Sequence, residues 1–140
     1  KGEFVDTDLE GKDISYDELL YMHDNKTGAL IRASILVGAT LSGAKDSDKE
    51  LLERYAKYIG LTFQIKDDIL SELGDEKVLG KPIGSDEKNK KVTYVTLVGL
   101  ENAKKEVERL SKEALDLCNQ ISVKNEFLKE MILYMIHREK

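Results

Sequence analysis

Apolar residues recur every three or four positions over most of the chain, which is the spacing of one face of an α-helix. Ser15 followed by Glu18 forms an S-x-x-E capping box, so a helix is predicted to begin near Tyr16. The apolar pattern then continues to about Leu41, with a possible break at "DNKTG", residues 24–28. No stretch alternates apolar and polar residues over a useful strand length. The pattern therefore predicts an all-α protein.

Four further helices are predicted downstream, over residues 46–73, 92–97, 101–120 and 126–138. The helix over 101–120 is the most clearly amphipathic, and its apolar face consists of Ala103, Val107, Leu110, Ala114, Leu117 and Ile121. Only the segment 74–91 is rich in residues that break helices. These residues are Gly74, Gly80, Pro82 and Gly84. We therefore expect a helical bundle interrupted by one long loop.

Composition favours one globular domain, since 140 residues with 41% hydrophobic and 35% charged residues can bury a modest core. The net charge of -5 argues against nucleic acid as the main partner. The single Cys118 rules out an internal disulfide and fits a reducing compartment. The longest run of low charge, residues 28–44, contains Arg32 and is too short to span a bilayer comfortably. We expect a cytoplasmic protein without a membrane span. The chain starts abruptly, without an initiator methionine, so we also expect that it is truncated.

The predicted helix over 46–73 carries a narrow polar stripe. Gln64, Asp67, Asp68 and Ser71 are spaced i, i+3, i+4 and i+7, so they lie on one side of the helix. Most of the remaining circumference is apolar, through Phe63, Ile65, Ile69, Leu70 and Leu73. A helix that is apolar on nearly all other sides is typical of the interior of a bundle. The stripe would then face a cavity rather than open water.

The adjacent carboxylates of Asp67 and Asp68 have two interpretations. They would repel each other in a partly buried site unless a cation neutralised them, and hard oxygen ligands on neighbouring turns suit Mg²⁺. Alternatively the stripe is a solvated outer face, because Glu53, Lys57 and Asp75 continue the same line. The residue pattern by itself leaves both interpretations open.

Two lysines lie near this helix in the sequence. Lys26 precedes Thr27 in "NKTG", and Lys81 lies between Gly80 and Pro82 in "LGKPIGSD". Each lysine could contact a phosphate, and the second could do so from a mobile loop. For each lysine taken alone, the pattern favours a side chain that reaches into solvent. An acidic stripe and two lysines together suggest a diphosphate held by Mg²⁺ and ammonium groups.

The pair His23–Asp24 is weak evidence for an HD-type metal phosphohydrolase. That class of site needs further His and Asp ligands, and the only other histidine is His137, near the C-terminus. His23 is therefore expected to lie on the helix surface or to support a metal ligand.

Three segments, "MHDNKTGALIRASILVGA", "IGLTFQIKDDIL" and "GDEKVLGKPIGSDEKNKKVTYV", resemble the C-terminal half of the trans-isoprenyl diphosphate synthases, or polyprenyl synthetases. Farnesyl and geranylgeranyl diphosphate synthases are the nearest members. The resemblance extends over essentially all 140 residues, down to the basic tail "IHREK". It implies the all-α bundle of class I isoprenoid synthases, usually a homodimer. Residues 1–140 would then form the C-terminal portion of one such domain.

The resemblance also implies roles for individual residues. The positions that match catalytic residues of the family are Lys26, Thr27, Gln64 and Lys81. The two lysines would contact the allylic diphosphate, while the threonine and the glutamine would line the reacting centre. Asp67 and Asp68 match the second aspartate-rich motif, which coordinates Mg²⁺ on that diphosphate. The implied reaction is ionisation of the allylic C–O bond, attack by isopentenyl diphosphate, and loss of a proton.

The chain departs from the family pattern in three places. Ser71 replaces the last aspartate of the family's DDxxD motif, and Glu3 stands where a glutamine is expected. The first aspartate-rich motif, with its arginines, has no counterpart in these residues. The resemblance therefore implies a fragment that is inactive alone. An alternative is a non-catalytic partner subunit that contributes helices to a prenyl synthase complex.

Overall fold

The computed structural model describes residues 14–79 and 92–138, and every regular element within these ranges is a helix. In chain order the elements are α2 (Tyr16–His23), the π-helical segment η1 (Asp24–Gly28), α3 (Ala29–Leu41), α4 (Asp46–Leu79), α5 (Tyr94–Val98), α6 (Leu100–Gln120) and α7 (Glu126–His137). The prediction of an all-α fold is confirmed. Among the described residues, no helix combines the length and the apolarity that crossing a membrane requires.

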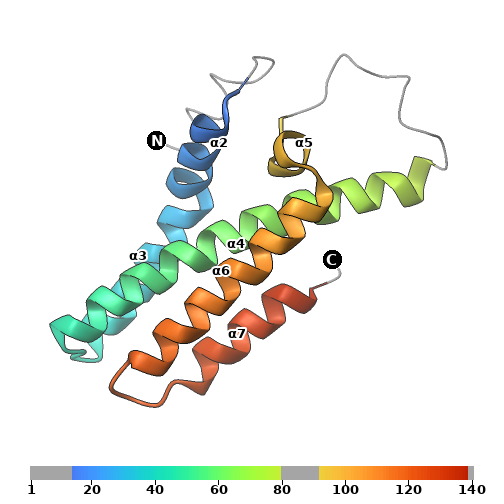
Figure 1. The fold of residues 1–140 in the computed structure, drawn as a ribbon. Coiled ribbons are helices and arrows are strands. Elements are labelled where there is room, and N and C mark those ends of the chain that lie inside the picture. The colour runs from blue at the N-terminus through green and yellow to red at the C-terminus, as the bar shows by residue number, and fades with distance from the viewer. Residues whose placement is uncertain (1–13, 80–91, 139–140) are drawn as a thin grey trace.

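The long helix α4 forms the centre of the bundle (Figure 1). α6 runs antiparallel to it along most of its length, and α7 turns back along α6. On another side of α4, the continuous run of α2, η1 and α3 descends in the opposite direction (Figure 1). The short helix α5 contacts α2, α4 and α6. α4 therefore meets every other element, and its side chains can connect all of them.

The interface between α4 and α6 supplies most of the core. Near the middle of α4, Ile65 and Ile69 pack with Ala103, Val107 and Leu110 of α6. Towards its N-terminus, a second cluster is formed by Tyr55, Ile59, Ala114, Leu117, Cys118 and Ile132. Burial of one large aliphatic side chain contributes about 1.5–3 kcal/mol. The apolar face predicted for residues 101–120 is buried at all six positions, so that prediction is confirmed.

The predicted start of the first helix is also confirmed. The amide N of Ser15 donates to Glu18 Oε2 at 2.9 Å, and the amide N of Glu18 donates to Ser15 Oγ at 3.3 Å. These reciprocal bonds satisfy two backbone donors at the start of α2. The Ser15 hydroxyl also donates to Glu18 Oε2 at 2.7 Å, and this bond, followed by the one from the Ser15 amide, lowers the pKa of Glu18.

Helix boundaries differ most from the prediction in two places. Residues 24–28 do not break the chain into two helices but form a π-helical turn that joins α2 to α3 without a loop. A π-turn accommodates one extra residue, which resolves the irregular pattern without ending the helix. α4 extends to Leu79 rather than to about Leu73, because Gly74 sits within the helix without ending it. A single helical glycine costs only about 1 kcal/mol relative to alanine, which a long packed helix tolerates.

Candidate functional site

The polar stripe of α4 lies outside the core while its neighbours are buried. Gln64, Asp67 and Asp68 are half-buried and Ser71 is exposed, whereas the adjacent Ile69 is buried. The helix α4 thus has an apolar side and a polar side, as the sequence predicted. Its apolar sides pack inside the bundle, and its acidic side remains accessible to a polar ligand.

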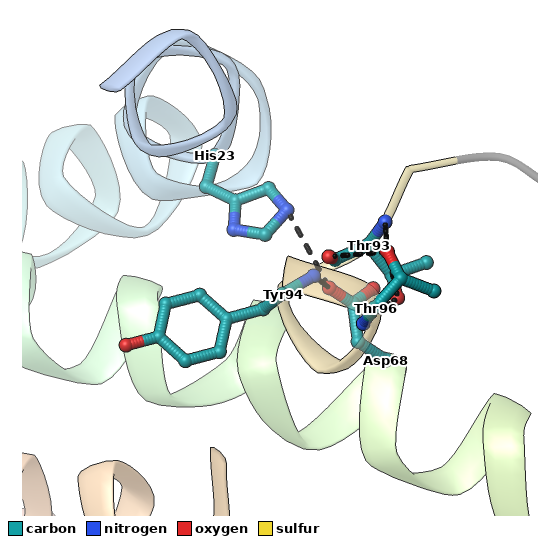
Figure 2. Close-up of polar contacts among 5 residues, drawn as sticks. All are labelled: His23, Asp68, Thr93, Tyr94 and Thr96. Atoms are coloured by element: carbon teal, nitrogen blue, oxygen red, sulfur yellow. Dashed lines mark hydrogen bonds and ion pairs between the residues drawn. The ribbon is translucent and has the colours of Figure 1, made fainter. Parts of the chain in front are cut away.

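Asp68 connects three elements of the fold. Its Oδ2 atom accepts a hydrogen bond of 2.8 Å from the backbone N of Tyr94, the first residue of α5. The same oxygen lies 3.9 Å from Nε2 of His23, the last residue of α2 (Figure 2). The side chain of Thr93 caps α5 through the amide N of Thr96 and so fixes the turn that presents Tyr94. The hydrogen bond from the Tyr94 backbone therefore holds one carboxylate oxygen of Asp68, and the His23 imidazole lies near the same oxygen.

Asp67 has a different partner. Its Oδ1 atom accepts a hydrogen bond from Nη2 of Arg138, at the C-terminal end of α7, and the two side chains form an ion pair. The Arg138 guanidinium also lies 4.6 Å from the centre of the Phe63 ring, within range of a cation–π contact. A cation therefore already sits on the first aspartate of the pair, supplied by the chain itself.

The Lys26–Thr27 dipeptide lies in η1, which packs against α4. Lys26 is exposed and Thr27 is half-buried. The fold thus brings the Lys26 segment and the acidic stripe onto the same helix surface. Lys81 lies outside the described residues, so its role stays a prediction.

Asp67 and Asp68 would hold a magnesium ion only together with a ligand that completes its coordination. Among the residues that the structure describes, no three His, Cys, Asp or Glu side chains gather at one place. A site made only of protein ligands is therefore not formed there. Mg²⁺ is commonly held by one or two carboxylates together with waters and substrate phosphates, which is the donor set that this pair offers.

Two residues of this site carry more weight than the sequence suggested. His23 is only 8% exposed, so a position on the helix surface is wrong, and the alternative of a residue that supports an acidic ligand fits its contact with Asp68. The sequence feature that could have indicated this role is the position of His23, three residues before Lys26. Arg138 belongs to the basic tail, but nothing in its local sequence indicated Asp67 as its partner.

A comparison with protein families decides the classification. The sequence profile of the family described as "Polyprenyl synthetase" matches residues 1–132. The chain belongs to the polyprenyl synthetase family. The farnesyl diphosphate synthase of Escherichia coli (strain K12) is 41% identical to this chain over 143 residues, a match that covers 99% of this chain and 48% of that protein. The geranylgeranyl diphosphate synthase of Cyanophora paradoxa is 46% identical over 114 residues, covering 81% of this chain and 38% of that protein.

A solved structure agrees with the fold of this chain. The heptaprenyl diphosphate synthase of Staphylococcus aureus superposes with a TM-score of 0.82, covering 99% of this chain and 56% of that one. Its identity is 23%, so the likeness establishes the fold alone. The chain spans about half the length of the relatives that it matches.

Proposed function

We propose that this chain is the C-terminal portion of a Mg²⁺-dependent trans-prenyltransferase. The complete enzyme would condense an allylic diphosphate with isopentenyl diphosphate to a short-chain product, farnesyl or geranylgeranyl diphosphate. Membership of the polyprenyl synthetase family supports the reaction class. The observation that carries the proposal is the placement of the Lys26 turn against the helix that bears Asp67 and Asp68.

In this proposal the chain binds the allylic diphosphate at the stripe of α4. Asp67 and Asp68 would hold Mg²⁺, which when bound neutralises negative charge on the diphosphate as the C–O bond breaks. Lys26 would donate charge-assisted hydrogen bonds to the same diphosphate from η1, and Lys81 would do so from the loop. Donors fixed before the reaction stabilise the leaving group without reorganising.

Other residues of this surface would act on the hydrocarbon. Phe63 and Gln64 lie on α4 beside the aspartates, and Thr27 lies in η1. Removal of water from such a site protects an allylic cation from hydrolysis. Thr27 and Gln64 would line that reacting centre and keep polar oxygens at its edge.

The proposal includes a division of labour with a further part of the protein. The relatives are about twice as long as this chain, and the 140 residues contain no counterpart of a first aspartate-rich motif. We therefore propose that residues 1–140 bind a diphosphate but do not catalyse condensation alone. A cytoplasmic homodimer is part of the same proposal.

Binding of pyrophosphate tests the site. We expect the chain to bind pyrophosphate by calorimetry only when Mg²⁺ is present, and Asp67→Ala to weaken that binding at least tenfold, the loss of one metal ligand. Asp116→Ala, which removes an exposed aspartate from α6, is the matched control and should bind as the wild type does. Equal binding by Asp67→Ala and the wild type would show that the metal assignment is wrong.

Activity of the complete protein that contains this chain tests the reaction. We expect it to convert isopentenyl and dimethylallyl diphosphates to a short-chain product, detected by chromatography of the dephosphorylated prenyl alcohols. The 140-residue chain assayed in parallel should form none. A complete protein that lacks activity alone but stimulates a prenyl synthase would instead identify a partner subunit.

A further inference from the structure

Two glycines meet where η1 packs on α4. A Cβ atom built on Gly60 would lie 2.9 Å from the Cα atom of Gly28, well inside the ordinary contact distance of carbon atoms. Both residues are buried. Because the obstructing atom belongs to the backbone, rotation of a side chain cannot relieve the overlap. Any residue larger than glycine at position 60 would push η1 away from α4.

A second contact fixes the other end of the same turn. His23 precedes η1 and its Nε2 atom lies 3.9 Å from Asp68 Oδ2, while Gly28 ends η1 against Gly60. Residues 23–28 therefore run antiparallel to residues 60–68, with one contact at each end. Lys26 lies between the two contacts.

Gly60 also belongs to the acidic stripe. Gln64, Asp67 and Asp68 follow it at i+4, i+7 and i+8, so all four residues lie on one side of α4. The π-helical conformation of η1 adds to the argument, since single π-turns inserted between α-helices are frequent at functional sites. The glycine contact is thus made on the side of α4 that bears the two aspartates.

We propose that Gly60 is a positioning residue, whose missing side chain lets η1 approach α4 closely enough for Lys26 and the Asp67–Asp68 pair to hold one diphosphate. The inference rests on the proposed function, because it concerns the same diphosphate site. It assigns a role to a position that offers no chemical group of its own. Gly60 sets the distance between η1 and α4, whereas Lys26 and the two aspartates bind the diphosphate.

Gly60→Ala is the variant that tests this role, and Gly74→Ala is its matched control. Both glycines lie on α4, but a Cβ atom on Gly74 meets nothing within 4 Å. In the presence of Mg²⁺, we expect Gly60→Ala to bind pyrophosphate about five- to tenfold more weakly, because the charged hydrogen bond from Lys26 is stretched. Gly74→Ala should bind as the wild type does.

Two further measurements separate positioning from a general loss of structure. In ¹H–¹⁵N spectra, Gly60→Ala should shift the amide signals of residues 23–28 while the signals of α6 and α7 stay in place. Adding Lys26→Arg to Gly60→Ala should recover at least twofold in affinity, because the longer arginine side chain spans the widened gap. In the wild-type background the same Lys26→Arg change should give no gain.

Each outcome bears on one of the two proposals. Unchanged pyrophosphate affinity in Gly60→Ala, or amide shifts spread over the whole chain, would overturn the positioning role. Loss of helix content in Gly60→Ala by circular dichroism would also overturn it, since Gly60 would then be a requirement of the core. If the wild type binds no pyrophosphate, the proposed function fails, and the amide shifts still decide whether Gly60 sets the place of η1.

Discussion

Asp48, in the first turn of α4, and Asp67, about five turns further along, both accept hydrogen bonds from the last part of the described chain. Asp48 Oδ1 accepts from the amide N of Ser122 at 3.0 Å, and its Oδ2 accepts from the Ser122 hydroxyl at 2.5 Å. Asp67 accepts from Arg138 at the far end of α7. The helix α7 is therefore tied to α4 by a carboxylate at each of its ends.

The two carboxylates differ in what holds them. Asp48 is 5% exposed and accepts its hydrogen bonds from the neutral Ser122, in the connection between α6 and α7. The side chain of Asp67 is 46% exposed, its partner is a charged side chain near the end of the chain, and a second carboxylate follows it. The first contact belongs to the core of the bundle, whereas the proposed function requires that a metal ion displace the second. A carboxylate can bind a metal ion only if the metal can displace its partner within the protein.

The largest effect on stability is expected from Asp48→Ala. This change leaves two donors of Ser122 without their acceptor and loosens the connection between α6 and α7. We expect the midpoint of thermal unfolding, followed by circular dichroism, to fall by roughly 3–8 °C. Asp116→Ala, which removes an exposed carboxylate, should shift it by less than about 1 °C. Pyrophosphate binding at 20–25 °C should be unaffected. A loss of binding would contradict the view that Asp48 acts on stability and Asp67 on ligand binding.

The contribution of Asp48 should depend on pH. The hydrogen bonds from the Ser122 hydroxyl and amide hold the pKa of this carboxyl below its ordinary value of 3.8. A lowered pKa in the folded state means that the stabilisation is complete above about pH 4 and is lost as the pH falls through the folded pKa. The difference in unfolding midpoint between wild type and Asp48→Ala should therefore be constant from pH 5 to 7 and shrink below pH 3.8. Glu18 and Glu106, whose pKa values are also lowered, contribute equally to both proteins. If the difference in unfolding midpoint instead grew as the pH fell, the pKa of Asp48 would be raised in the folded protein, contrary to this prediction.

The sequence predicted the helices and the acidic stripe because both depend on local periodicity. The six apolar positions between Ala103 and Ile121 repeat at helical spacing, and the i, i+3, i+4, i+7 pattern from Gln64 to Ser71 needs no tertiary information. The capping box at Ser15 is equally local. These predictions were confirmed for that reason.

The partners of the aspartates could not be predicted in the same way. Arg138 meets Asp67, and Tyr94 meets Asp68, only because α7 and α5 return to α4 after long excursions of the chain. The Gly28–Gly60 contact depends equally on how two helices approach each other. Such distances follow from packing over the whole bundle, and a pattern of apolar and polar residues carries no information about them.

Removal of the competing guanidinium should strengthen metal binding modestly. Arg138→Gln frees Asp67 from its ion pair, and an ion pair at a half-exposed carboxylate contributes about 0.2–1 kcal/mol. We expect pyrophosphate, titrated by calorimetry in the presence of Mg²⁺, to bind roughly two- to fivefold more tightly. Arg109→Gln breaks the ion pair with Glu106 on α6 and serves as the control, with unchanged affinity. Weaker binding by Arg138→Gln would mean that the guanidinium supports the metal site rather than competing for it.

The smallest effect is expected from Tyr94→Phe. This change removes the hydroxyl contact of Tyr94 and keeps its backbone hydrogen bond to Asp68. The Tyr94 hydroxyl lies 3.1 Å from the Tyr16 hydroxyl, whereas Asp68 is held by the backbone N of Tyr94. Tyr94 is buried but its partner Tyr16 is exposed, so loss of the Tyr94 hydroxyl should cost about 0.5 kcal/mol of unfolding free energy in urea. Tyr55→Phe, which removes a buried donor to the Leu128 carbonyl, should cost about 1–2 kcal/mol under the same conditions. Pyrophosphate affinity should be the same in Tyr94→Phe and the wild type, because the backbone bond to the carboxylate survives the change. A weaker pyrophosphate affinity in Tyr94→Phe would mean that the Tyr94 hydroxyl, rather than its backbone N, positions Asp68.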